Sequence, residues 1–215
     1  PEIFNDNKFH GWDGKSPLKI IMHHWSPNFM KGFDVYQEID NLLTNSEWSS
    51  KIEFTYIGNL PPGFSFKKTK HIKPISGKKL GLELSKHHLY ISASINEPAG
   101  MHHIEGIMCG LPIIYRESGA LPEYCKNYGV SFKERNFLPA LIKIMKGYTE
   151  YKKRVNKYPN NSIKMSSEYL NLFEDLIKKR DFIIKKRKLL SSPILLLKNC
   201  LFLFFKIKSV VRFFR

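Results

Sequence analysis

Cysteine is scarce in this sequence, which holds only Cys109, Cys125 and Cys200 among 215 residues. Their spacing matches neither the paired cysteines of a zinc site nor the dense pattern of a secreted disulfide scaffold. A basic segment followed by an apolar one is also lacking after Pro1, so we expect no signal peptide. These absences predict reduced thiols in a cytoplasmic protein.

Acidic residues are few as well. The chain has 19 Asp and Glu against 35 Lys and Arg, a formal net charge of +16. Such a surface attracts phosphate-rich partners, which include nucleotides, nucleic acids and anionic lipids. Nucleic acid is the least favoured, because the basic residues cluster in an apolar C-terminal segment and no stacking or recognition motif is present. We expect no nucleic-acid partner.

Apolar runs long enough to span a membrane are also missing from the basic C-terminal segment. From Lys178 onward, twelve Lys or Arg face one acid, Asp181, and surround short apolar runs at 193–197, 200–205 and 210–214. A spanning helix needs roughly 20 apolar residues, and lysines interrupt these runs. We therefore expect residues 180–215 to form a tail in the interface of an anionic membrane. Packing of its aromatic side chains on another domain is the alternative.

The residues that are present between positions 18 and 132 alternate between two patterns. Apolar runs of strand character are separated by segments with helical spacing, which is typical of a parallel sheet with helices on both faces. The sequence therefore predicts a Rossmann-like α/β domain. The expected strands are 18–23, 52–57, 71–75, 88–92, 112–115 and 130–132, and the expected helices are 34–43, 78–86, 101–109 and 119–126.

After Phe132 the pattern becomes helical. Residues 136–147 and 162–179 have helical spacing, and the polar stretch 158–161 between them contains Pro159 and two Asn residues. Proline stops a helix and Asn caps one, so the break predicts two separate C-terminal helices.

Residues 94–112 carry the main chemical signal. A buried strand is expected to end near Ser94, and a helix starting about Gly100 is expected to end at Gly110. In an open α/β sheet this junction lies at the carboxyl edge, where ligands bind. The free amides of Gly100, Met101 and His102 at the positive helix end would suit a diphosphate, and Gly100 would let the ligand approach closely.

Two carboxylates flank these amides. Glu97 precedes the helix and Glu105 lies more than a turn inside it, so both could face one cleft. A carboxylate accepts hydrogen bonds from vicinal hydroxyls but cannot hold a phosphate. The spacing fits a sugar at one end of a diphosphate and ribose at the other. The competing interpretation is that both are ordinary surface acids.

The same residues resemble a known signature. Glu97 and Glu105 with Gly110-Leu111-Pro112, then Gly119-Ala120-Leu121-Pro122-Glu123, resemble the donor site of family 4 glycosyltransferases with the GT-B fold. Lys31-Gly32 and Tyr56-Ile57-Gly58 resemble two upstream elements of that family. The resemblance covers residues 18–179 and implies the C-terminal, nucleotide-sugar-binding domain.

The resemblance also implies roles for individual residues. Glu97 would contact a donor hexose, Gly100 and Met101 would offer amides to sugar and phosphate, and Glu105 would hold the ribose. Lys31 would neutralise the diphosphate as it leaves, without a metal or cofactor. Ile75, at the end of the expected strand 71–75, would lie against the base.

The sequence departs from the family in two respects. The family places an Arg a few residues before its Lys-Gly element, whereas this chain has none before Arg116, and His24 is the candidate substitute. His102 could donate a hydrogen bond near the donor phosphates. The family's N-terminal domain has no counterpart here, and residues 1–17 resemble the linker that would follow it. We therefore expect a separate acceptor-side domain or subunit.

The resulting expectation is a retaining hexosyltransferase that acts on a surface-glycan or lipid-linked acceptor, at the inner face of a membrane. The alternative is a non-catalytic subunit that binds a nucleotide sugar or anchors a partner enzyme. The three His-His pairs do not predict a metal site, because adjacent side chains point in different directions.

Overall fold

The computed structural model describes residues 2–7, 11–187, 194, 196–198 and 200–202. The chain divides into two compact units, Pro1–Lys164 and Met165–Arg215. Most of the apolar runs of the expected tail, including all of 210–214, lie outside the described residues.

The first unit is built on one six-stranded sheet, and every strand pairs in parallel with its neighbours. The strand order is β3-β2-β1-β4-β5-β6. This confirms the predicted Rossmann-like α/β sheet. The strands are β1 (Leu18–His24), β2 (Ile52–Gly58), β3 (Lys70–Ile72), β4 (Leu89–Ser92), β5 (Ile113–Arg116) and β6 (Gly129–Phe132).

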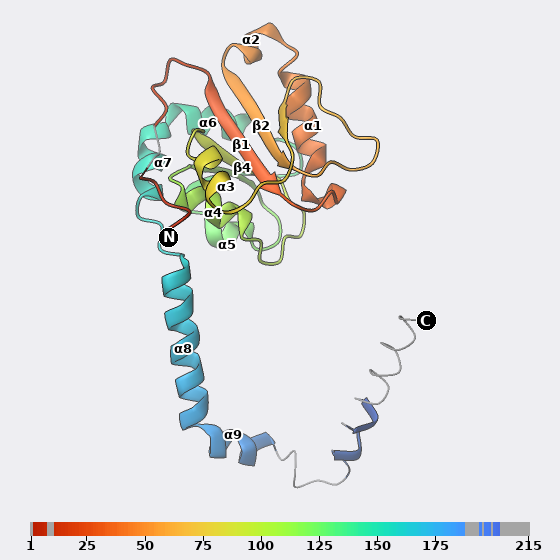
Figure 1. Cartoon of the computed structure of the whole chain (residues 1–215), viewed down its shortest axis with the longest axis vertical. Coiled ribbons are helices and arrows are strands. Elements are labelled where there is room, and N and C mark those ends of the chain that lie inside the picture. The colour runs from red at the N-terminus through yellow and green to blue at the C-terminus, as the bar shows by residue number, and fades with distance from the viewer. Residues whose placement is uncertain (1, 8–10, 188–193, 195, 199, 203–215) are drawn as a thin grey trace. The chain divides into compact units, whose positions relative to one another are not determined.

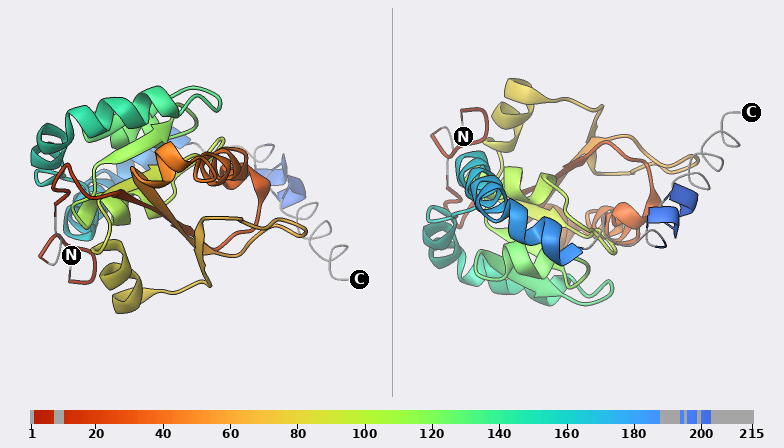
Figure 2. Two further views of the ribbon diagram at one scale, coloured as in Figure 1. Left: turned by 90° about the horizontal axis from the view of Figure 1, so that it is seen from above. Right: turned by 90° about the horizontal axis from the view of Figure 1, so that it is seen from below.

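Helices cover both faces of the sheet, as Figures 1 and 2 show: α1 and α6 lie on one face, and α3 and α4 on the other. Strands β1, β4 and β5 are therefore almost continuously buried, which explains why their sequences are apolar throughout rather than alternating. The helices are α1 (Phe33–Leu42), α3 (Gly77–Leu84), α4 (His102–Met108), α5 (Leu121–Cys125) and α6 (Leu138–Lys146).

Three short elements were not expected from the sequence. These are the 3-10 turn η1 (Phe29–Lys31), α2 (Ser46–Ser49) and α7 (Tyr148–Val155). In α7 the buried residues Tyr148 and Val155 are seven positions apart, which is helical spacing. This spacing is the signal that could have predicted the helix.

The expected strand 71–75 is wrong at its C-terminal end. β3 stops at Ile72, and Ile75 lies in the loop that leads to α3. Pro74 explains the early stop, because proline has no amide hydrogen for the sheet ladder. The helix expected from about Gly100 likewise begins later, at His102.

The strand order reverses between β1 and β4, because the chain runs outward from β1 to β3 and then returns to place β4 on the other side. In doubly wound sheets, ligands bind in the crevice at the carboxyl ends of the strands at such a switch point. His23 and His24 end β1, and Ser92 ends β4. The fold therefore places the start of residues 94–112 at the carboxyl edge of the sheet, as the sequence predicted.

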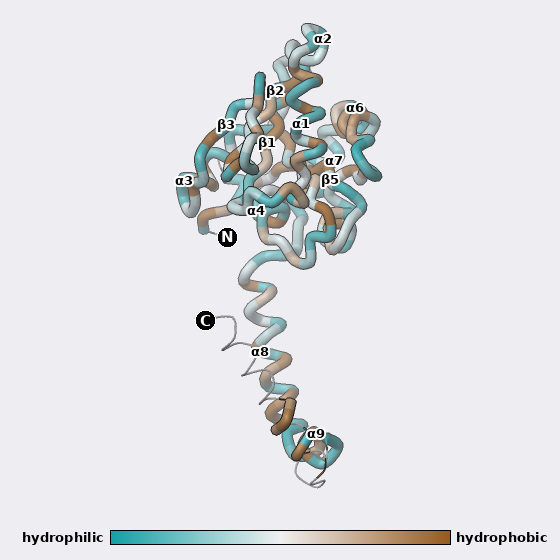
Figure 3. Tube along the Cα trace, turned by 90° about the vertical axis from the view of Figure 1, so that its right-hand side faces the viewer, coloured by the Kyte–Doolittle hydropathy of each residue, from teal (hydrophilic) through white to brown (hydrophobic). Residues whose placement is uncertain are grey.

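The second unit contains most of α8 (Ser162–Lys178) and α9 (Arg180–Arg187). Apolar residues recur along α8 (Figure 3), and none of its residues is buried. At helical angles Met165, Tyr169, Leu172 and Leu176 share one side with Phe173. Within the part of the chain that the structure describes, every helix is too short or too polar to span a membrane.

Candidate functional site

A cavity of about 450 Å³ lies at the carboxyl ends of β1 and β4. All eight residues singled out in the sequence line it: His24, Lys31, Ile75, Glu97, Gly100, Met101, His102 and Glu105. They come from five separate segments, so the sheet brings them together and not their order along the chain.

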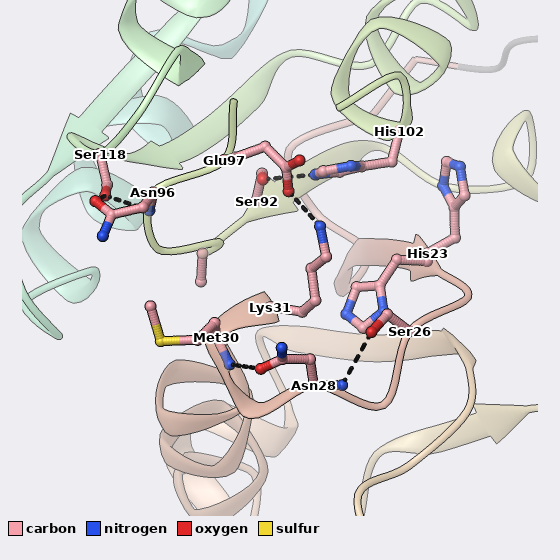
Figure 4. A network of polar contacts seen from close by, with 12 residues as sticks. His23, Ser26, Asn28, Met30, Lys31, Ser92, Asn96, Glu97, His102 and Ser118 are labelled. Atoms are coloured by element: carbon pink, nitrogen blue, oxygen red, sulfur yellow. Dashed lines mark hydrogen bonds and ion pairs between the residues drawn. The ribbon is translucent and has the colours of Figure 1, made fainter. Parts of the chain in front are cut away.

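Lys31 and Glu97 form an ion pair at the centre of this group. Lys31 Nζ donates to Glu97 Oε2 at 2.6 Å, and Figure 4 shows the lysine reaching from η1 toward the carboxylate. The Glu97 side chain is only 6% exposed. A buried carboxylate needs a partner to offset its desolvation, and Lys31 supplies a charge-assisted hydrogen bond.

The loop before α1 holds Lys31 in place. The Asn28 side chain accepts a hydrogen bond from the Met30 amide at 2.9 Å, and Gly32 ends η1 in a left-handed conformation. The Ile95 amide donates to the Met30 carbonyl at 2.7 Å, which ties this loop to the segment after β4. The Lys-Gly element thus lies beside the segment that carries Glu97.

A second glycine segment holds the backbone of Glu97. The Ala120 amide donates to the Glu97 carbonyl at 2.8 Å, and Gly119 has a φ of +57°. A Cβ on Gly119 would lie 2.3 Å from the Glu97 carbonyl oxygen, so no side chain fits. Ser118 contacts Asn96 next to it, as Figure 4 shows. The Gly119-Ala120 part of the sequence signature is therefore a support for Glu97.

The segment from Gly100 to His102 follows the Glu97 turn. Within the described residues, the amides of Gly100, Met101 and His102 donate no hydrogen bond to the protein. A Cβ on Gly100 would lie 2.8 Å from the His102 ring and 2.9 Å from the Glu97 carboxyl carbon. Glycine therefore keeps the backbone close to both side chains.

His102 and His24 are neutral groups in this cavity. His102 Nε2 lies 3.0 Å from Ser92 Oγ, and burial holds the pKa of His102 well below its usual value. Burial, with the charge of Lys31, lowers the pKa of His24 to about 3. A neutral His24 offers a hydrogen bond but no charge, so it does not replace the arginine of the resembled family in electrostatic terms.

Glu105 faces the cavity from inside α4 and has its own partner. His23 Nε2 lies 2.7 Å from Glu105 Oε2, and His23 Nδ1 lies 3.0 Å from the Tyr90 hydroxyl. Tyr90 is fully buried under α4, where Gly106 leaves room for its ring. Sequence reasoning named Glu105 but missed His23 as a site residue, because the two are 82 positions apart.

An apolar end completes the cavity. Ile75, Pro74 and Leu80 line it together with Phe4 from the N-terminal segment. A Cβ on Gly81 in α3 would lie 2.6 Å from the Ile3 carbonyl oxygen, so this segment packs closely on α3. The sequence marked Phe4 only as part of a linker-like segment and not as a site residue, because only tertiary packing brings residues 2–7 to the site.

Among the described residues, no three His, Cys, Asp or Glu side chains gather as potential metal ligands. Cys109 and Cys125 are buried and free, and burial raises the pKa of Cys109 to about 12. This buried thiol therefore stays protonated at neutral pH.

No family model and no curated protein matches the sequence. Solved structures do match. TarM superimposes with a TM-score of 0.60 at 15% identity, over 80% of this chain and 37% of TarM. The catalytic domain of starch synthase IV from Arabidopsis thaliana, bound to ADP and acarbose, gives 0.57 at 15% identity, over 83% of this chain and 40% of that one.

The C-terminal domain of a glycosyl transferase group 1 family protein (LpcC) from Francisella tularensis gives a TM-score of 0.54 at 16% identity. The match covers 73% of this chain and 92% of that domain, whereas the chain spans less than half of TarM and of the starch synthase domain. At these identities the likeness concerns the fold. The chain has the fold of the C-terminal domain of GT-B glycosyltransferases.

Proposed function

We propose that this chain is the nucleotide-sugar-binding domain of a retaining glycosyltransferase of family 4 type. One observation carries the proposal: a lysine and two carboxylates, Lys31, Glu97 and Glu105, line one cavity at the switch point of a parallel sheet. The likeness of the fold to glycosyltransferase domains supports it.

The chemistry of the cavity matches the three parts of a nucleotide sugar. Lys31 and the amides from Gly100 to His102 suit the diphosphate, because both are donors and Lys31 is cationic. The carboxylates at either side suit the hydroxyls of a hexose and a ribose. The apolar end with Ile75 suits the base.

The ion pair indicates what donor binding would change. Bound diphosphate would take Lys31 as its counter-ion, and hexose hydroxyls would donate to Glu97 in its place. Transfer breaks the bond between the sugar C1 and the phosphate oxygen, and the electron pair leaves with the nucleoside diphosphate. The acceptor oxygen bonds to C1 on the same face, and its proton passes to the leaving phosphate. Lys31 would stabilise the charge that develops on the leaving group.

We also propose where the acceptor would bind. A glycan or lipid-linked acceptor would be held by a second domain or subunit, with the protein at the inner face of a membrane. The alternative function is a non-catalytic subunit that binds a nucleotide sugar or anchors a partner enzyme. Binding without transfer, even when an acceptor-side domain is supplied, would favour that alternative.

Calorimetric titration with UDP, GDP and ADP and their glucose, galactose and mannose derivatives tests the proposal. We expect nucleotides of one base to bind. Lys31→Ala should weaken the binding of the nucleoside diphosphate more than that of the corresponding nucleoside, because it removes the positive charge that pairs with the phosphates. Lys152→Ala in α7, outside the cavity lining, is the matched control. Absence of binding by any member of the panel at millimolar concentration would overturn the assignment.

A further inference from the structure

The end of β1 carries a side chain that the proposed donor site does not yet use. We infer that His23 is a positioning residue for Glu105, which it holds in the orientation that recognises ribose hydroxyls. This inference rests on the proposed function, since it assigns Glu105 to ribose. It adds a second residue, from a different element, on which nucleotide recognition depends.

Three elements meet at this contact. His23 ends β1, Tyr90 lies in β4, and Glu105 lies within α4. The His23 side chain is 8% exposed and that of Glu105 is 25% exposed, so the carboxylate still reaches the cavity while the imidazole is almost enclosed. A buried side chain that contacts a partly exposed binding residue is suited to orient that residue.

The hydrogen bonds determine which ring nitrogen carries the proton. An ionised carboxylate only accepts, so the 2.7 Å contact requires a proton on His23 Nε2. In a neutral imidazole Nδ1 then accepts, and the Tyr90 hydroxyl, 3.0 Å away, donates to it. Burial raises the pKa of Tyr90 well above its usual value, so the tyrosine keeps its proton. The carboxylate therefore sets the tautomer of His23, and Tyr90 satisfies the remaining ring nitrogen.

The arrangement leaves Glu105 with one oxygen engaged. Oε2 accepts from His23, and within the described residues Oε1 has no hydrogen bond from the protein. The contact thus restrains the carboxylate while acceptor positions remain for a ligand. A hydrogen bond from a buried neighbour keeps a binding side chain in its productive geometry.

The test compares nucleoside diphosphates with and without ribose hydroxyls. UDP, ADP and GDP and their 2′,3′-dideoxy forms are titrated into the wild-type chain, His23→Leu and His23→Gln. We expect His23→Leu to lower the affinity for the tightest-binding ribonucleoside diphosphate by about tenfold, which corresponds to the loss of one charge-assisted hydrogen bond. The dideoxy form should change by less than about twofold, and His23→Gln should restore most of the loss because its amide can donate.

Two further variants separate positioning from general damage. His87→Leu removes another buried histidine, which contacts Thr55 Oγ1 and the Glu83 carbonyl outside the cavity lining, and should leave both nucleotide forms unaffected. Tyr90→Phe removes only the hydroxyl and should reduce the ribose preference in the same direction as His23→Leu. It keeps the test decisive if His23→Leu does not fold.

The outcomes distinguish failure of this inference from failure of the proposed function. If the wild type binds a diphosphate but the substitutions at His23 weaken ribose and dideoxy forms equally, His23 is only structural and the inference fails. If the wild type binds ribose and dideoxy forms alike, Glu105 does not read ribose, and the inference also fails. If the wild type binds no diphosphate, both the proposed function and the inference fall.

Discussion

At the scale of single residues, the cavity is lined by one lysine, two carboxylates and the neutral side chains of His24 and His102. Lys31 is paired with Glu97, and burial lowers the pKa values of His24 and His102, so neither ring carries charge at neutral pH. The positive charge that a diphosphate would meet comes from Lys31. Substitution of Lys31 and of each carboxylate should therefore affect the binding of different parts of the ligand.

The two carboxylates are expected to differ when each is removed. Glu105→Ala should weaken binding of the nucleoside diphosphate, whereas Glu97→Ala should mainly reduce the preference for the intact nucleotide sugar. The reason is that lost hydrogen bonds leave ligand hydroxyls unpaired, at a cost of about 1–3 kcal/mol at the end concerned. Calorimetric titration of both ligand forms measures this, with the exposed Glu150→Ala as the control. Negligible and equal effects would identify ordinary surface acids.

At the scale of elements, the turn that carries Glu97 is held from outside its own segment. Gly119 and Ala120, between β5 and α5, contact the Glu97 backbone, and the loop before α1 contacts the same region through Ile95. Both glycine elements of the sequence signature thus pack next to Glu97, the residue that we propose contacts the sugar. Their effect on ligand binding should be separable from general backbone strain.

Gly119→Ala tests this separation. It places a Cβ against the Glu97 carbonyl and a side chain at a φ of +57°, so we expect a loss in unfolding free energy above the ~1–2 kcal/mol of left-handed strain alone. It should also weaken nucleotide-sugar binding, because Glu97 must shift. Gly63→Ala is the matched control, since its φ is +74° but nothing lies within 4 Å of the added Cβ. Denaturant unfolding and titration measure both. Identical behaviour of the two variants would show that Gly119 does not support Glu97.

At the scale of the whole molecule, charge and apolar character are unevenly distributed along the chain. Twelve of its 35 Lys and Arg fall at or beyond Lys178, where Asp181 is the only acid. The α8 helix before them presents apolar side chains that the described structure leaves exposed. A role for the C-terminal region in binding an anionic surface is therefore an expectation that experiment can test.

We expect the basic, apolar tail to hold the protein on anionic membranes. Each basic residue near such a surface contributes about 1 kcal/mol, and buried Phe and Leu side chains add to this. Flotation with anionic liposomes, at low and high salt, compares the full chain with a version ending at Lys179. The full chain should float at low salt and the shortened one should not. A full chain that stays in the soluble fraction at low salt would favour packing of the tail on another domain.

The sequence by itself determined the elements and marked the candidate binding residues. The sequence predicted all six strands, and β1, β4 and β5 are the clearest because strands buried on both faces must be apolar. The Glu97 to Glu105 spacing marked a turn followed by a helix. Such signals are local, since each depends on residues within a few turns of one another. The end of β3 lies earlier than expected because Pro74 has no amide hydrogen to continue the sheet.

Only the tertiary structure decided which groups are partners. Lys31 and Glu97 are 66 positions apart, and His23 and Glu105 are 82 apart, so no periodicity connects them. Phe4 likewise reaches the cavity from the N-terminal segment. The physical reason is the strand order: when the chain returns to place β4 beside β1, side chains distant in sequence meet at one edge, and burial there lowers the pKa values of His24 and His102.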